Sequence, residues 1–408
     1  MKLAMRLLAG IACVMLATGA TTPISPAPPG ASPAAESSLD RPYAAFGFDA
    51  LRELRVEEPN TNVFISPTSI AIALAMAANG AEGSTRTAIL SVLGAQGETI
   101  DTLNAANQTL IAQLGASQAV QLSIANALWL QQGFPVTPSF RDTLQTSYGA
   151  QAENLDFHSA DAPATINAWA AKHTNDRIQK IVESIDPSTI VMLTNAVAFK
   201  GKWTLPFDPQ STQPHDFTTA AGSVRKLPMM AHAAEYAYAK AGETETIRLP
   251  YADRSFAMYV VLPRDADAMQ GFLHDLTPDT FAGLLSSLQM GPGTIELPRF
   301  TIAYDATLNR MLGTLGMGIA FGSDANFNGI HQAPPPVQIS EVRHASFLKV
   351  DEEGTEAAAV TSIGMRTMAM RVEPAPFHMI VDRPFFLAIR DEHSGQILFT
   401  GTIVDPQP

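Results

Sequence analysis

The sequence predicts an α+β fold with antiparallel or mixed β-sheets. Helical patterns dominate the first half of the chain and strand patterns the second half, without the regular strand–helix alternation that builds a parallel sheet. No segment of 20–50 residues repeats, which excludes a solenoid or propeller. With 408 residues, 46% of them hydrophobic, the chain can bury a large core as one big domain or two ordinary ones.

The first forty residues are expected to lie outside the fold. Residues 1–20 combine a basic start at Lys2 and Arg6 with an apolar run too short to span a membrane, which is typical of a signal peptide. The only cysteine, Cys13, lies inside this run, where a lipid anchor is the alternative. Residues 21–40 form a Pro/Ala/Ser-rich linker. The protein is therefore expected to be exported, either secreted to the extracellular medium or periplasmic, and without disulfides.

Regular elements follow from residue 43 onward. Residues 43–57 carry a helical apolar stripe that stops near Pro59; Ser66-Pro67 opens an apolar helix that Gly80 closes, and Gly94 stops the next one. Loosely alternating or β-rich runs predict strands, and a helix is expected around Trp169. The expected helices are 43–57, 68–79, 82–93 and 165–182, and the expected strands are 62–65, 122–130 and 190–199, with a turn at 201–203.

The second half is expected to be strand-rich. Two apolar runs flank the turn at 252–254, and two more flank the hairpin signal at 391–395. Helical patterns precede Gly316 and follow Thr277. The expected strands are 246–249, 256–262, 294–300, 301–304, 385–390 and 396–404, and the expected helices are 278–288 and 307–315.

Charge and motifs exclude several function classes. Twenty-six basic residues against 39 acidic ones give a net charge of −13, which disfavours a nucleic-acid partner, and no later stretch is apolar enough to indicate a membrane partner. The nucleophile, zinc, phosphate-loop and dinucleotide motifs GxSxG, HExxH, GxxxxGK[ST], CxxC and GxGxxG do not occur, and nine histidines lack metal-ligand spacing. Ser66, His344 and several aspartates would nominally supply a catalytic triad, but any chain of this length contains such sets. No metal or cofactor is expected.

The most informative segment is DEEGTEAAAVT at residues 351–361. Its side chains offer no acid–base or nucleophilic chemistry, but Gly354 is a backbone hinge that reaches positive φ at little cost. One interpretation is the first turn of a helix, with acidic residues before an alanine run.

Side-chain alternation decides between a helix and a strand for this segment. In a strand, one face carries no charge over thirteen residues, whereas the other face carries both Glu356 and Arg366. A helix would mix these charges into its faces. The segment can therefore become a buried strand, although it can be a loop in a single static structure. The uncharged face consists of Thr355, Ala357, Ala359, Thr361, Ile363, Met365 and Thr367.

Five blocks in order make the chain resemble the serpin family, from about Arg41 to Pro406. Each block alone is moderately specific, but their order, together with the hinge and the chain's end, is very specific. The blocks are NVFISPTSIAIALAMAANGAEGSTRTAILSVLG (62–94), LTNAVAFKGKWTLPFDPQST (193–212), LPRFTIAYDATLNRMLGTLGM (297–317), ISEVRHASFLKVDEEGTEAAAVT (339–361) and DRPFFLAIRDEHSGQILFTGTIVDP (382–406).

The resemblance implies one serpin domain over residues 41–408, with three β-sheets, eight or nine helices and an exposed reactive-centre loop. It implies a suicide-substrate inhibitor rather than an enzyme: a target serine protease, or a cysteine protease, cleaves the loop, and the loop inserts into the central sheet before the acyl-enzyme is hydrolysed. The protein is expected to be a monomer and to need no cofactor. A non-inhibitory serpin with a binding or structural role is the alternative within the fold, and a secreted hydrolase is the alternative from another class. Small residues on the inward hinge face favour inhibition over the non-inhibitory alternative, and the missing catalytic motifs disfavour the hydrolase.

The resemblance also assigns residues to roles. Trp203 corresponds to the tryptophan at the upper end of the sheet, near where the loop enters. Two larger sets are assigned. The hinge comprises Glu352, Glu353, Gly354, Thr355, Glu356, Ala357, Ala358, Ala359, Val360 and Thr361, and the hydrogen-bonded cluster where the sheet opens comprises Ser66, Ser69, Asn195 and His344.

The position of the scissile bond depends on how the loop is counted. Counting the family's usual loop length from Glu352 places the bond between Met368 and Ala369. Counting back from Asp382 gives a position near Glu373 instead. We prefer the first count because the length of the inserted strand is mechanically constrained. Arg366 and Arg371 remain alternatives that would indicate trypsin-like targets.

Overall fold

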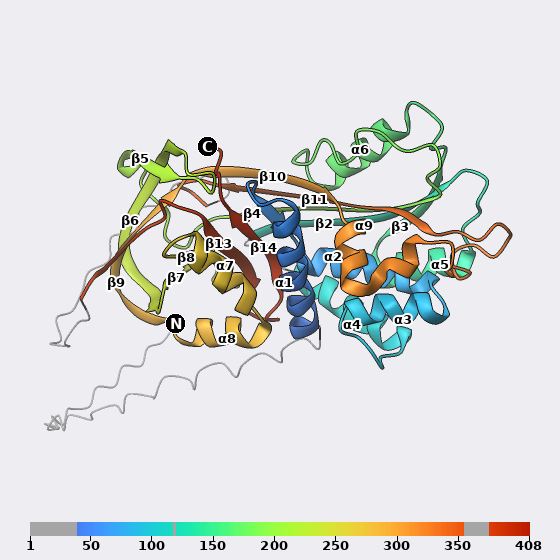
Figure 1. The fold of residues 1–408 in the computed structure, drawn as a ribbon, viewed down its shortest axis with the longest axis horizontal. Helices are drawn as coiled ribbons and strands as arrows, with labels where there is room; N and C mark the ends of the chain where they lie inside the picture. Colours follow the sequence, from blue (N-terminus) through green and yellow to red (C-terminus); the bar gives the residue numbers. More distant parts are fainter. Residues whose placement is uncertain (1–38, 117–119, 355–374) are drawn as a thin grey trace, which may run out of the picture. The chain divides into compact units, whose positions relative to one another are not determined.

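The computed structural model describes residues 39–116, 120–354 and 375–408. These residues form an α+β fold, as the sequence predicts (Figure 1). In the described part of the chain the α-helices are α1 Asp40–Glu57, α2 Pro67–Gly80, α3 Gly83–Val92, α4 Ile100–Gly115, α5 Pro138–Thr143, α6 Ala162–His173, α7 Ala266–Asp275, α8 Pro278–Ser286 and α9 Asn309–Leu312. No helix among these residues is long and apolar enough to cross a membrane.

The strands of the described residues fall into a five-stranded and a nine-stranded sheet. The five-stranded sheet contains β2 Val120–Gln131, β3 Gln151–Leu155, β4 Val191–Gly201, β10 Phe300–Thr307 and β11 Ile339–Val350. The nine-stranded sheet contains β1 Val63–Ile65, β5 Gln213–Thr218, β6 Val224–Ala241, β7 Thr244–Pro250, β8 Phe256–Pro263, β9 Gln289–Pro298, β12 Phe377–Ile380, β13 Phe385–Asp391 and β14 Ile397–Ile403.

The expected count of three sheets differs from these two because of one long strand. The 18-residue β6 pairs with β5 at its start, with β9 along its middle and with β7 at its end. It therefore joins strands that would otherwise form two sheets into one continuous ladder, in the order β1-β14-β13-β8-β7-β6-β9-β12 with β5 on β6.

The five-stranded sheet has the order β10-β11-β4-β2-β3, and its central pair is parallel. Strand β10 runs antiparallel to β11, and β2 runs antiparallel to β4, so β4 and β11 point the same way between antiparallel neighbours. A chain that leaves the end of β11 and reverses would run antiparallel to both central strands. The topology thus provides a place for one further strand in the middle of the sheet.

Helices cover both faces of this sheet, with α2 and α4 on one side and α6 on the other (Figure 1). Every residue of α2 except Asn79 is buried, as expected for a helix that is apolar all round. Helix α2 contacts β4 and β2 of the five-stranded sheet and β14 of the other sheet. On the opposite face, Trp169 of α6 packs edge-on against Trp129 of β2 in a separate small core.

Several predicted boundaries were wrong for local reasons. The helix predicted over 165–182 is α6, which ends at His173 because Asn175 and Asp176 take positive φ angles of 51° and 60°. The helix predicted over 307–315 contains only α9 and a wider turn in which Gly316 has φ 109°. The strand predicted over 294–300 is longer at its start and ends at Pro298.

Candidate functional site: the central strands and the hinge

The predicted sheet-opening cluster is formed in the middle of the five-stranded sheet. Asn195 of β4 lies opposite His344 of β11 and, on its other side, opposite Asn126 of β2. His344 Nδ1 lies 2.6 Å from Asn195 Oδ1, and the Ser66 backbone N–H donates to His344 Nε2 at 3.4 Å. The cluster therefore ties the two parallel strands to each other and to the start of α2.

The Asn195 carboxamide uses its donors as well as its acceptor. Its Nδ2 donates to Ser69 Oγ and to Asn126 Oδ1, the latter at 2.6 Å. Ser66 Oγ caps α2 by accepting a hydrogen bond from the Ser69 backbone N–H at 3.3 Å. All four predicted residues of the cluster are buried and lie together, and Asn126 is a fifth member that the sequence reasoning missed.

The hydrogen-bond pattern requires a neutral His344 ring. Nδ1 must donate to the Asn195 carbonyl oxygen, and Nε2 must accept from a backbone N–H, which a protonated ring cannot do. Burial lowers the pKa of His344 to about 3. The ring is consequently a neutral structural link between strands.

The cluster is not built for nucleophilic catalysis. Ser66 bonds to His344 through its backbone N–H, and its hydroxyl instead serves the helix cap. A nucleophile would need its hydroxyl on the base and a third group to orient the base. The described residues also contain no group of three His, Cys, Asp or Glu side chains that could hold a metal ion.

At the upper end of the sheet, the hinge begins as a tight turn of residues 351–354. This turn follows β11 and lies against the end of β4. Asp351 and Gly354 exchange both backbone hydrogen bonds, at 3.1 and 3.2 Å, and Gly354 also forms an antiparallel bridge to Lys202, just after β4. Gly354 has φ +120°, and a Cβ there would lie 2.4 Å from Gly201 O and 2.5 Å from Trp203 N. Only glycine fits, and its backbone already runs antiparallel to the ends of both central strands.

Glu352 anchors this turn through a buried carboxylate. Arg299 Nη2 forms an ion pair with it, and Thr212 Oγ1 donates a hydrogen bond at 2.6 Å. Burial alone would raise the pKa of Glu352, but the hydrogen bonds from Arg299 and Thr212, together with the Arg299 charge, lower it overall. The Phe207 backbone N–H also donates to Glu352 O at 2.7 Å. Both the side-chain carboxylate and the backbone carbonyl of Glu352 are therefore held by hydrogen bonds.

Trp203, which follows β4, lies beside the hinge turn at the upper end of the sheet. Its Nε1 donates to Asp351 O at 3.0 Å, and its ring stacks on Tyr251 with centroids 4.6 Å apart. Its backbone N–H donates to Glu353 O at 3.1 Å. The indole therefore holds the turn against the end of β4.

The structure describes only part of the predicted loop. Glu352, Glu353 and Gly354 lie in the turn, whereas residues 355–361 of the hinge and the candidate scissile residues Arg366, Met368, Ala369 and Arg371 lie outside the described residues. The sequence reasoning missed Asn126, Arg299, Thr212 and Tyr251. Of these, only Asn126 carries a local signal, because it is a polar residue within the apolar run IANALWL.

Comparisons with known proteins agree on one family. The family model described as "Serpin (serine protease inhibitor)" matches residues 41–406. Serpin-Z7 of Hordeum vulgare is 30% identical over 86% of this chain and 91% of its own length. An uncharacterized serpin-like protein of Methanosarcina mazei is 32% identical over 89% of this chain and 86% of its own length.

Solved structures match the whole described fold. The native state of tengpin, a thermophilic serpin, superposes with a TM-score of 0.81 at 30% identity, covering 92% of this chain and 97% of tengpin. Human thyroxine-binding globulin in complex with its ligand gives a TM-score of 0.83 at 26% identity, covering 91% of this chain and 99% of that structure.

The neutral His344 ring predicts a loss of stability in mild acid. In the unfolded chain, His344 binds a proton below about pH 6.5, whereas in the folded chain it does so only near pH 3. The free energy of unfolding therefore falls as the pH drops between these values, by up to about 1.4 kcal/mol per pH unit. Urea-unfolding midpoints measured from pH 7 to pH 4 should show this slope. His344→Gln should flatten the slope while lowering stability at every pH. Control His274→Gln, at an exposed position, should keep the slope, and an equal slope in both variants would contradict the assignment.

The Glu352 anchor predicts unequal effects of two neighbouring substitutions. Glu352→Gln removes the charge that pairs with Arg299 and should lower the stability of the intact chain by about 1–3 kcal/mol. Glu353→Gln is the matched control: Glu353 Oε2 is buried without a hydrogen-bond partner among the described residues, so this change should be neutral or stabilising. Urea-unfolding midpoints at pH 7 compare the two, and equal losses would exclude the anchor.

Proposed function

Because this chain belongs to the serpin family, which is of the protease-inhibitor type rather than a family of enzymes, we propose that it is a suicide-substrate inhibitor of serine proteases. The observation that carries the proposal is the arrangement at the top of the five-stranded sheet. Strands β4 and β11 are parallel neighbours, and the chain that leaves β11 has already reversed at Gly354 to pair with the end of each.

The proposed reaction uses the protease's own chemistry. The protease serine attacks the carbonyl of Met368, an ester forms between them, and the peptide bond to Ala369 breaks so that the amine of Ala369 leaves. The segment after Gly354 then enters between β4 and β11 before water hydrolyses the ester. Displacement of the attached protease during this insertion distorts its active site.

Sheet insertion is favourable for two physical reasons. A strand between β4 and β11 replaces one set of ladder hydrogen bonds by two, and its uncharged face from Thr355 to Thr367 can be buried without charge penalty. The intact protein is therefore a metastable form, and cleavage releases the stored free energy.

Membership of the serpin family does not by itself establish that a protein inhibits proteases. The residues of the loop distinguish an inhibitory serpin from a non-inhibitory one with a binding or structural role. Thyroxine-binding globulin has a similar fold at 26% identity and was solved with thyroxine bound. The small and β-branched residues that follow Gly354 here support insertion and hence inhibition rather than a purely binding role.

The direct test is complex formation with proteases. The mature protein is incubated with elastase-, chymotrypsin-, subtilisin- and trypsin-like enzymes, and at least one should form an SDS-stable complex. Thr355→Arg puts a charge on the inward face at the first residue after Gly354, where burial of an unpaired charge is very costly. This variant should fold and be cleaved but form no stable complex. Control Glu356→Arg changes the opposite face and should retain inhibition; undiminished inhibition by Thr355→Arg would mean that another segment inserts.

Loop cleavage should also stabilise the protein, against the usual effect of a chain break. If residues 355–367 become a central strand, a nick in the loop should raise the thermal midpoint by tens of degrees, since several kcal/mol are gained and each is worth roughly 2–4 °C in a domain of this size or a little smaller. Thermal unfolding of intact and nicked protein measures this. A nicked form that melts at or below the intact midpoint would contradict insertion.

The residue before the scissile bond should set the target class. Met368 is long, flexible and uncharged, which suits apolar pockets of elastase-, chymotrypsin- or subtilisin-like proteases. Met368→Arg should shift inhibition towards trypsin-like enzymes, while Arg366→Ala and Arg371→Ala should leave the spectrum nearly intact. The released peptide should begin at Ala369. Loss of inhibition in either arginine variant, or a different first residue, would place the scissile bond elsewhere in the loop.

A further inference from the structure

A polar hollow of about 470 Å³ lies at the lower end of the five-stranded sheet, which is the end opposite to the hinge, where β4 and β11 begin. The segment that leads into β4 lines one side of the hollow with Asp186 and Ser188. The start of β11 and the end of β10 line the other side with Glu341, Arg343 and Thr307. The volume is within the range of ligand pockets and is ample for one long side chain.

One hydrogen bond joins the two sides of this hollow. Ser340 Oγ accepts it from the Ile190 backbone N–H at 2.9 Å, so that the residue before β4 is held against β11. A strand that enters between β4 and β11 would separate Ser340 from Ile190 and would come to lie between the two sides. A side chain of that strand would then point into the hollow.

The turn at Gly354 fixes the register of an inserted strand. Gly354 forms antiparallel bridges to Lys202, just after β4, and to Asp351, just after β11. If this pairing continues, each residue further along the loop lies one residue further back along both neighbouring strands. The position of every loop residue against β4 and β11 therefore follows from these two bridges.

The two bridges give the same register independently. Seven residues beyond Gly354 in the loop is Thr361. Seven residues back from the two bridge partners are Asn195 of β4 and His344 of β11. Asn195 and His344 already lie opposite each other in the parallel ladder. Thr361 would thus be inserted between them, whichever strand is used for the count.

The same count brings Arg366 to the beginning of both central strands. Arg366 is twelve residues beyond Gly354, and twelve residues back from the two bridge partners are Ile190 and Ile339. At about 3.3 Å per residue, Arg366 would lie about 40 Å from the turn. This is the level of the sheet at which the hollow is found.

Side-chain alternation brings Arg366 to the correct face. His344 faces α2, because its ring accepts a hydrogen bond from the N-cap residue of that helix. Arg343 and Glu341 are an odd number of residues from His344, so they face the opposite side, and both line the hollow. Arg366 is likewise an odd number of residues from Thr361, which would lie level with His344. Its side chain would therefore point to the side of the hollow.

The charges of the hollow complement an arginine. Of the described residues that line it, Asp186 and Glu341 are acidic and Arg343 is basic. Arg343 Nη2 pairs with Glu341 Oε1 at 2.8 Å, so the negative charge of Asp186 remains uncompensated within the lining. Hydrogen bonds from the Ser188 hydroxyl and backbone N–H, at 2.6 and 2.8 Å, lower the pKa of Asp186 and keep it ionised at neutral pH. A guanidinium beside this carboxylate gains a charge-assisted hydrogen bond.

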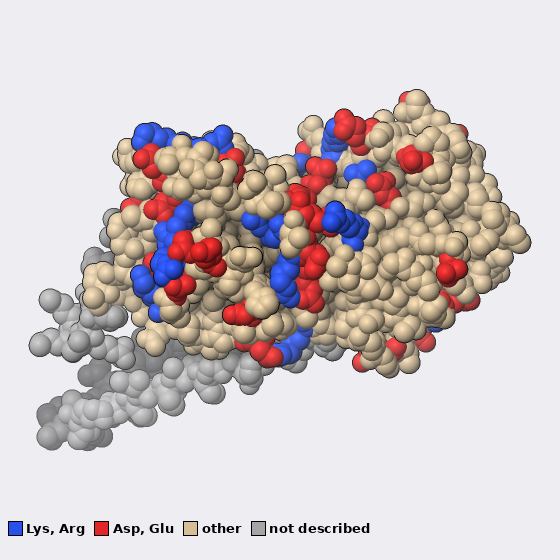
Figure 2. Space-filling model, viewed as in Figure 1, with Lys and Arg blue, Asp and Glu red and all other residues tan. Residues whose placement is uncertain are grey.

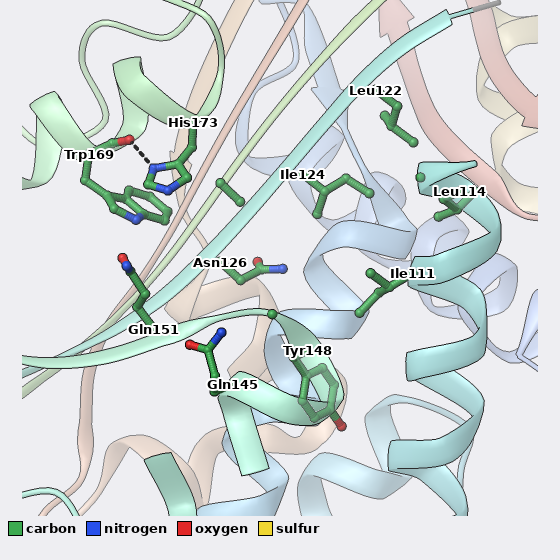
Figure 3. Close-up of a pocket in the computed structure, with 13 residues that line it drawn as sticks. Ile111, Leu114, Leu122, Ile124, Asn126, Gln145, Tyr148, Gln151, Trp169 and His173 are labelled. Atoms are coloured by element: carbon green, nitrogen blue, oxygen red, sulfur yellow. Dashed lines mark hydrogen bonds between the residues drawn. The ribbon is translucent and has the colours of Figure 1, made fainter. Parts of the chain in front are cut away.

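Nearby surfaces of the protein do not offer such a partner. The cavity between β2, α4 and α6 is lined by no Asp or Glu among the described residues (Figure 3). On the face drawn in Figure 2, few charged side chains lie over α3, α4 and α5. An arginine that arrives at the lower end of the sheet therefore finds its counter-charge in the hollow and not in the neighbouring cavity.

We propose that this hollow binds the side chain of Arg366 in the inserted form, between Asp186 on the β4 side and Glu341 on the β11 side, and that the contact fixes the end of the inserted strand. The proposal rests on the proposed function. It makes Arg366 a positioning residue, which acts after cleavage and not on the reacting bond. Withdrawal of the strand would first have to break this contact, so the inserted form should persist longer with it than without it.

A double-mutant cycle on the nicked protein tests the contact. The loop is cut between Arg366 and Arg371 by a subtilisin-like protease, and the mass of the released fragment locates the cut. Thermal midpoints are measured in urea, which brings the transition into range without screening charges. Arg366→Gln and Asp186→Asn should each lower the nicked midpoint by about 2–4 °C, and the double variant should lower it no further than one of them alone. In the intact protein the two substitutions should show no coupling.

Two further variants are the matched controls. Arg371→Gln changes the other arginine of the loop, beyond the cut, and should leave the nicked midpoint unchanged. Glu183→Gln changes an exposed carboxylate of the same segment as Asp186, outside the hollow, and should show no coupling to Arg366→Gln. If no protease cuts between the two arginines, a recognition sequence for a site-specific protease introduced after Met368 supplies the cut.

The outcomes separate the docking of Arg366 from the proposed function. A nicked form that is no more stable than the intact one overturns both. A stabilised nicked form in which the effects of Arg366→Gln and Asp186→Asn simply add, or in which Glu183→Gln couples equally, overturns the docking and leaves insertion standing.

The lifetime of the protease complex tests what the contact does. Arg366→Gln should form complexes with the same proteases as the wild-type protein, but these complexes should release active protease severalfold faster. Complexes of Arg371→Gln should release it at the wild-type rate. An unchanged release rate for Arg366→Gln overturns the role of the contact in fixing the end of the strand.

Discussion

The parallel contact between β4 and β11 is the constraint on which the rest of the structure depends. Parallel pairing is slightly less stable per residue than antiparallel pairing, and here it joins two strands that each have an antiparallel partner on the other side. The contact is the one parallel contact between two long strands of the described sheet, whereas the other parallel pair, β2 and β3, lies at its edge. A new antiparallel strand between β4 and β11 would pair on both of its sides. The Asn195–His344 bond and the turn at Gly354 both lie along this contact.

Two sets of polar contacts stabilise the β4–β11 region, one in the middle of the sheet and one at its upper end. In the middle, Asn195 and His344 bond to each other and, through Ser66, to the start of α2. At the upper end, Glu352 bonds to Arg299. The first set and the Glu352 carboxylate are buried, so breaking either set of contacts would leave buried polar groups without partners. Under the proposed function, this cost would fall mainly on the transition state of insertion and would let the intact form persist.

The same buried polar residues show which parts of the structure the sequence could not predict. The α+β class, the buried helix after Ser66-Pro67 and the family were predictable, because apolar periodicity, a helix cap and five ordered blocks are local signals. The bonds from Glu352 to Arg299 and Thr212 join residues 53 and 140 positions apart, and no local pattern marks them. The early end of α6 depends on positive φ angles at Asn175 and Asp176, which the residue types permit but do not require. The first case depends on contacts between distant parts of the chain, and the second on a local backbone conformation that composition does not determine.

Gly354 shows how these elements combine. Starting a new strand inside a sheet normally requires a reversal of the chain and a first pair of hydrogen bonds before any further pairing is gained, as the first turn does for a helix. Here the reversal already exists, fixed by Glu352 below it and by Trp203 beside it, and Gly354 already bridges to both Asp351 and Lys202. Insertion after cleavage would therefore proceed as elongation from a formed nucleus, with the parting of Asn195 from His344 as the step that elongation must drive. The narrow requirement for glycine at this position follows from the same geometry, because the backbone of Gly201 and Trp203 leaves no room for a side chain.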